Sequence, residues 1–225
     1  MQKNLLAGLI AAAVLGITTI QAHAADPIRI AFNDPLSGPF AATGINGLHE
    51  FEYAVAEINK NGGVLGRQLE VVGFDNKVSP KEALIQLKSI IGQKIQFMFQ
   101  GNSSGVANAL TDAVEKQNER NPDERLLFLN YSAVDPALTE EKCTFWHFRF
   151  DPHADMKMNA LIGVLAKDER LKKVYVIGQD YSFGKAVAAA AEKYLKAKRP
   201  DVEIVGNQLH PIGKVKDFSP YIAKI

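Results

Sequence analysis

Residues 28–63 read IRIAFNDPLSGPFAATGINGLHEFEYAVAEINKNGG. The apolar run 28–33 stops at Asp34-Pro35, which predicts a short strand that ends in a loop. From residue 44 to residue 61 apolar side chains recur at steps of three and four, and two glycines follow. This spacing predicts an amphipathic helix with a glycine stop. A strand, a loop and a helix in this order form the basic unit of an α/β fold.

The same alternation continues along the chain. We expect further strands at residues 68–75, 95–100, 126–130, 145–150, 173–178 and 202–209, and further helices that begin near residues 79, 105, 151 and 183. Ser79-Pro80-Lys81-Glu82 predicts a capping box, in which Ser79 caps the amide three residues on and Glu82 reaches back. Strands that alternate with helices of this length imply parallel sheets covered on both faces.

The alternation falls into two groups that meet near residues 148–151. We therefore predict an α/β protein with two Rossmann-like lobes, a first lobe at 25–148 and a second at 149–225. Because residues 217–225 resemble the opening of another helix, we expect the second lobe to be incomplete in this chain.

The first residues have the order of a secretory signal peptide. Lys3 precedes an apolar run over residues 5–20, and the small-x-small sequence Ala22-His23-Ala24 follows. The run is short for a membrane anchor, which needs about 20 apolar residues. We predict a signal peptide at residues 1–24, cleaved near Ala24, and a mature protein exported to the periplasm.

The composition excludes several classes of partner and site. Lys plus Arg number 26 and Asp plus Glu 25, a near-balance that argues against nucleic acid and anionic membranes as partners. Cys143 is the one cysteine, so no intramolecular disulfide can form. Its apolar neighbours predict a small residue in or near the core, and a reactive thiol is the alternative. The histidines show no metal-ligand spacing, and the loop at 35–44 lacks the glycine spacing of a dinucleotide site. We expect neither a metal nor a cofactor.

The strongest candidate for a binding site is the turn Gly101-Asn-Ser-Ser-Gly105, which lies directly before a predicted helix. Ligands of open parallel sheets bind beyond the carboxyl ends of the strands. A Gly/Ser turn at a helix start offers free amides and hydroxyls to an anion such as a carboxylate. The same turn spells G-x-S-x-G, so a serine hydrolase remains open, with Ser103 as nucleophile, Asp135 as acid and His147, His153 or His210 as base. A plain helix cap is the third interpretation.

Several motifs stand in one order along the chain: Pro35-Leu-Ser-Gly-Pro39, Ala56-Glu-Ile-Asn59, Gly62-Gly-Val-Leu-Gly66, Asp135-Pro-Ala-Leu-Thr139 and Tyr181-Ser-Phe-Gly184. They resemble the leucine/isoleucine/valine-binding family of type I periplasmic binding proteins, the solute receptors of ABC importers. The resemblance implies a monomeric two-lobed protein that closes over an amino acid or a related small carboxylate or amide, delivers it to a membrane permease and catalyses nothing. A ligand sensor on the same fold is an alternative.

The resemblance also suggests which residues meet the ligand. Ser104 stands where the family's serine binds the ligand carboxylate, and an aromatic residue closes from the second lobe. At Val134 and Thr43 the sequence departs from the family's pattern, which argues against the usual branched-chain ligand. The expected ligand-binding residues are Ser103, Ser104, Ser132, Ala133, Tyr181, Phe183 and Thr43.

Overall fold

The first unit of the fold is built on a five-stranded sheet. The computed structural model describes residues 26–225, so the predicted signal peptide at 1–24 lies outside the described residues. All neighbouring strands are parallel and run in the order β2-β1-β3-β4-β5. Their bounds are β1 (Ile28–Asp34), β2 (Leu69–Asp75), β3 (Phe97–Gln100), β4 (Leu127–Asn130) and β5 (His147–Arg149).

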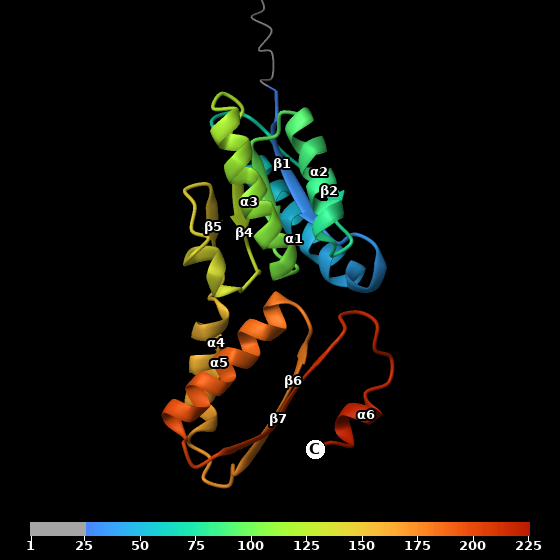
Figure 1. The fold of residues 1–225 in the computed structure, drawn as a ribbon. Helices are drawn as coiled ribbons and strands as arrows, with labels where there is room; N and C mark the ends of the chain where they lie inside the picture. The colour runs from blue at the N-terminus through green and yellow to red at the C-terminus, as the bar shows by residue number, and fades with distance from the viewer. Residues whose placement is uncertain (1–25) are drawn as a thin grey trace, which may run out of the picture.

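Helices cover both faces of this sheet (Figure 1). Successive side chains of a strand point to opposite faces. In β1, Ala31 therefore joins the core under α2 (Pro80–Gly92) and α3 (Ser104–Arg120). Its neighbour Phe32 packs on the other face against Phe51 of α1 (Ala41–Lys60), with ring centroids 5.2 Å apart. This two-faced burial explains why apolar residues stand next to one another in β1, β3 and β4.

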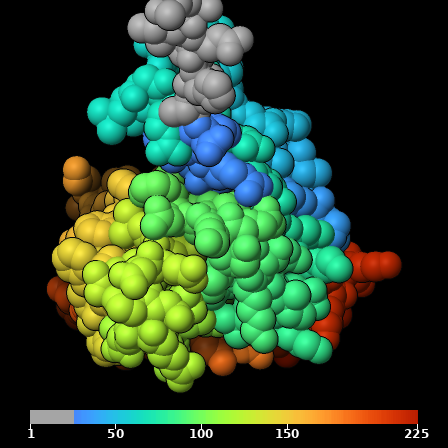
Figure 2. Space-filling view, turned by 90° about the horizontal axis from the view of Figure 1, so that it is seen from above, coloured from blue at the N-terminus to red at the C-terminus, as the bar shows by residue number. Residues whose placement is uncertain are grey.

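The second unit repeats the pattern on a smaller scale. Its two strands, β6 (Lys173–Gln179) and β7 (Glu203–His210), are parallel, and α4 (Ala154–Leu165) packs against α5 (Ser182–Lys198). The short elements are the 3-10 turns η1 (Gly38–Phe40) and η2 (Pro136–Thr139) and the helix α6 (Ser219–Ile222). Seen from above, the first unit covers most of the visible face, and orange and red segments of the second unit emerge at its edges (Figure 2). None of the helices within residues 26–225 has the length and apolar character needed to cross a membrane.

The predicted fold class, two α/β units with parallel sheets, is confirmed. The strands and helices follow one another in the predicted order. The expected lobe boundary between residues 148 and 149 falls inside β5, whose last residue Arg149 still pairs with Asn130 of β4. The chain leaves the first sheet only after Arg149, and α4 begins at Ala154.

Two local predictions are wrong. The hydroxyl of Ser79 accepts the N–H of Glu82 as expected, but the amide of Ser79 donates to the carbonyl of Asn76 at 2.8 Å and not to the side chain of Glu82. The left-handed backbone at Lys77 and Val78 turns that carbonyl toward the helix start. Cys143 is exposed, because it lies in the turn before β5 and its apolar neighbours do not take it into the core.

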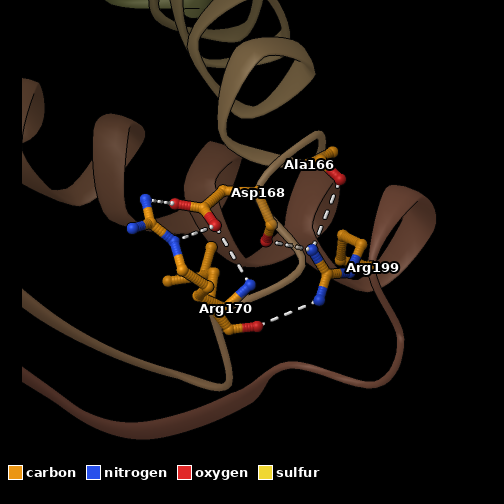
Figure 3. Close-up of polar contacts among 5 residues, drawn as sticks. Ala166, Asp168, Arg170 and Arg199 are labelled. Carbon is orange, nitrogen blue, oxygen red and sulfur yellow. Dashed lines mark hydrogen bonds and ion pairs between the residues drawn. The ribbon is translucent and has the colours of Figure 1, made fainter.

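The guanidinium of Arg199 joins the ends of α4 and α5 (Figure 3). It donates to the carbonyls of Ala166 at 3.3 Å, Asp168 at 2.9 Å and Leu171 at 2.9 Å. The Arg199 side chain is only 13% exposed, whereas that of nearby Arg170 is 90% exposed and bonds only to Asp168. Arg199 therefore satisfies carbonyls that the end of a helix leaves free.

We expect Arg199→Met to lower the thermal unfolding midpoint by several degrees, because three backbone carbonyls lose a charged donor. Arg170→Met, which removes the same charge from the neighbouring loop between α4 and β6, is the matched control and should leave the midpoint nearly unchanged. Circular dichroism melts of the two variants make the comparison. Equal melting of both would show that the Arg199 contacts contribute nothing to stability.

Candidate ligand-binding site

The turn at residues 101–105 places two serines at the start of α3. Ser103 is the N-cap residue, and its hydroxyl accepts the N–H of Val106 at 3.4 Å. Its backbone has φ +88°, a conformation that L-residues other than glycine rarely adopt. Backbone strain of this kind persists only where surrounding contacts hold it. Gln100 contributes one of them, because its Nε2 donates to the carbonyl of Asn102 at 2.7 Å.

The carboxylate of Asp34 provides the other support. Asp34 is fully buried at the end of β1, and its Oδ1 accepts the N–H groups of Gly101 at 3.4 Å and Asn102 at 3.0 Å. Its Oδ2 accepts the side-chain amide of Asn102 at 3.0 Å and the hydroxyl of Tyr131. Burial raises the pKa of Asp34 to about 6, although these donors favour the charged form. Asp34 therefore connects the turn at 101–105 to β1 and to the loop after β4 through hydrogen bonds.

Tyr131 fits because two glycines flank it. A Cβ on Gly101 would lie 2.6 Å from the Tyr131 ring, and a Cβ on Gly47 would lie 3.2 Å from its hydroxyl. The ring is also close to Phe32 and Phe51, with centroids 5.9 Å and 5.6 Å away. The tyrosine is thus fixed between α1 and the serine turn, with its hydroxyl held at Asp34.

The starts of α3 and α5 lie next to each other where the two units meet (Figure 1). A Cβ on Gly105 would lie 3.9 Å from the hydroxyl oxygen of Ser182 and 3.9 Å from the ring of Tyr181. The hydroxyls of Ser104 and Ser182 are both buried and have no hydrogen-bond partner among residues 26–225. Buried polar groups are normally paired, so two unpaired hydroxyls at two helix N-termini suit an anionic ligand such as a carboxylate.

The other predicted residues lie around this point. The amides of Ser132 and Ala133 donate to Oδ1 of Asn130 at 3.1 Å and 2.7 Å, and the carbonyl of Ala133 accepts its Nδ2 at 2.9 Å. The backbone N–H groups of both residues are thus already satisfied, which leaves the exposed side chain of Ser132 to meet a ligand. Thr43 and Ser132 line one open hollow of about 380 Å³. Phe183 packs against Tyr181, with ring centroids 5.8 Å apart.

Sequence reasoning missed four residues of this region: Asp34, Asn102, Tyr131 and Ser182. A signal for Asp34 was present, since parallel strands β1, β3 and β4 each end in buried polar residues, Asp34, Gln100 and Asn130. A polar side chain buried at the carboxyl end of such a strand needs a partner in the adjoining loops. The unpaired state of Ser182, by contrast, depends on how the two units meet and has no sequence signal.

The hydrolase interpretation gains no support from the geometry. The Ser103 hydroxyl caps Val106, and within the described part of the chain no hydrogen bond joins it to a histidine. His147, a proposed base, is buried in β5, where burial and then Arg149 lower its pKa to about 4. Residues 26–225 also contain no group of three side chains suited to hold a metal ion.

Residues 27–225 match the family model described as periplasmic binding protein. The chain belongs to this family. The resemblance predicted from the motifs is thereby confirmed. Because the match covers both units, it applies to the whole described fold.

Two named relatives and one solved structure agree with this family assignment. Leu/Ile/Val-binding protein homolog 4 of Brucella abortus (strain 2308) is 36% identical over 99% of this chain and 53% of its own length. The Leu/Ile/Val-binding protein of Escherichia coli (strain K12) is 26% identical over 99% of this chain and 56% of its own. The crystal structure of the closed leucine-, isoleucine-, valine-, threonine- and alanine-binding protein from Brucella ovis has 35% identity and a TM-score of 0.73, covering 88% of this chain and 50% of that one. The chain spans about half the length of the relatives it matches.

Ionisation of Asp34 should make stability fall with rising pH in one window. Its pKa of about 6 lies above the ordinary aspartate pKa of 3.8, so the folded state holds its proton more tightly than the unfolded chain. Asp34 therefore makes its full contribution to the free energy of unfolding below pH 3.8 and loses it as the pH rises through about 6. The loss amounts to about 3 kcal/mol at most. In Asp34→Asn this decrease should disappear, as measured by urea unfolding at several pH values. The same decrease in both proteins would assign it to other groups.

Proposed function

We propose that this protein is a periplasmic solute-binding receptor of an ABC importer, and that it captures an amino acid or a related small carboxylate or amide between its two units. The observation that supports this most directly is the pair of buried, unpaired hydroxyls of Ser104 and Ser182 at two facing helix starts. A carboxylate placed between them would accept hydrogen bonds from both units at once. Such a ligand would stabilise the closed arrangement by binding it better than any open one.

The proposal gives each candidate residue a role. Ser104 and the amides at the start of α3 take the carboxylate, and Ser182 approaches it from α5. Ser103 caps the helix, Tyr181 covers the ligand from the second unit with Phe183 behind it, and Thr43, Ser132 and Ala133 line the first-unit wall. These groups are hydrogen-bond donors and packing surfaces with no activated nucleophile among them, so the protein binds its ligand without breaking a bond.

The family supports the cellular setting of the proposal. Residues 1–24 act as a signal peptide that is cleaved near Ala24, the mature protein works in the periplasm as a monomer, and a membrane permease receives the ligand. Residues 25–148 form the first ligand-binding lobe and 149–225 the part of the second lobe that this chain contains. The names of the relatives point to aliphatic amino acids, while Val134 and Thr43 argue for a different ligand side chain.

Ser104→Ala should weaken carboxylate binding about tenfold or more, because a hydrogen bond to a charged group is lost. Isothermal titration calorimetry with amino acids, aromatic acids and their amides would first identify a ligand and then measure this loss. Ser89→Ala, on the exposed side of α2, is the matched control. Unchanged affinity in Ser104→Ala would refute the assigned carboxylate site, and covalent labelling of Ser103 by a serine-directed phosphonate would favour a hydrolase instead.

A further inference from the structure

The hollow beside the serine turn has a polar lining. It measures about 380 Å³ and lies between α1 and the loops after β3 and β4. Thr43, Asn46 and Glu50 come from α1, while Asn102, Tyr131 and Ser132 come from the loops. Asn102 belongs to the turn that precedes α3, so the hollow borders this turn; the buried Ser104 hydroxyl, which has no partner, lies two residues further along the chain.

The charged groups around this hollow are all acidic. Glu50 is exposed at its rim and forms no ion pair with any residue of 26–225. The buried carboxylate of Asp34 lies behind Tyr131 and Asn102, which both donate to it. No lysine, arginine or histidine lines the hollow. Burial, then Asp34 and more weakly Glu50, raise the pKa of Tyr131 far above its usual value, so its hydroxyl stays protonated and keeps donating to Asp34.

The acceptors in the hollow are also available. Both carboxylate oxygens of Glu50 and the Oδ1 of Asn102 accept no side-chain hydrogen bond in the described chain. The Nδ2 of Asn102 is engaged with Asp34 and Tyr131, which fixes the amide so that its oxygen is left for another donor. The small side chain of Thr43 leaves this space open. A group that enters it therefore meets acceptors and negative charge.

We propose that this hollow is a subsite for the far end of the ligand and that it takes a cationic group, an ammonium or a guanidinium. The inference rests on the proposed function, because it assumes that the other end of the ligand is a carboxylate held at Ser104 and Ser182. The ligand class is then a carboxylate with a positively charged tail, of which basic amino acids are the simplest examples. An aliphatic tail would offer the Glu50 and Asn102 oxygens no donor, whereas a cationic tail would donate hydrogen bonds to them.

The test compares L-arginine and L-lysine with L-leucine by isothermal titration calorimetry on the full chain. Arginine should bind more tightly than leucine, and Glu50→Gln should weaken arginine binding about fivefold or more while leucine binding stays the same. Glu52→Gln is the matched control, since it removes the same charge from an exposed position of α1 that does not line the hollow. Raising the salt concentration should weaken arginine binding more than leucine binding.

The outcomes separate the two proposals. Leucine binding that depends on Ser104, together with arginine binding that is no tighter or is unaffected by Glu50→Gln, would overturn the cationic subsite and leave the receptor function standing. An equal loss of arginine binding in Glu52→Gln would also overturn it, because the effect would then be one of net charge. Absence of binding by arginine, lysine, leucine and the wider carboxylate panel would overturn both proposals.

Discussion

The carboxylate of Asp34 joins the parts of the first unit on which the candidate site depends. It connects the end of β1 to the turn before α3 and to the tyrosine after β4. A buried charge is costly unless donors surround it, and here four donors from two loops do so. The same bonds hold Ser103 in a backbone conformation that it would not adopt alone. The position of the ligand turn is therefore set by the sheet beneath it and is fixed before any ligand arrives.

The hydroxyls of Ser104 and Ser182 contrast with this satisfied network. Each unpaired buried hydroxyl costs on the order of 1–3 kcal/mol relative to a paired one, so the arrangement with the units close together carries an energetic cost without a ligand. A carboxylate that pairs with both hydroxyls removes that cost and adds charge-assisted bonds. On the proposed function, a ligand that contributes the missing partners would shift the equilibrium toward the closed arrangement.

The sequence was sufficient to predict the fold because the relevant patterns are local. The apolar run 28–33, the helical spacing after Gly44 and the Ser79 cap each depend on residues close together in the chain. The site was only partly predictable. The glycines and serines before α3 pointed to the first-unit side of the candidate site. Two other features follow from the order of the strands in the sheet and could not be predicted. Asn130 accepts the amides of Ser132 and Ala133, and Asp34 contacts residues 68 and 97 positions away in the chain. Cys143 shows that a local pattern can also mislead, because apolar neighbours in a loop do not imply that a residue is buried.

The placement of Tyr131 between Gly47 and Gly101 makes these three positions depend on one another. A side chain at Gly101 would overlap the tyrosine and one at Gly47 would crowd it together with Phe32, while a smaller residue at 131 would open space between α1 and the serine turn. Effects of substitutions at such touching sites do not add. A larger residue at 101 would need position 131 to shrink first, and one at 47 would need Phe32 to give way as well, so this wall can be reshaped only by combined exchanges. The volume offered to a ligand at this wall is therefore set jointly by residues on α1, after β3 and after β4.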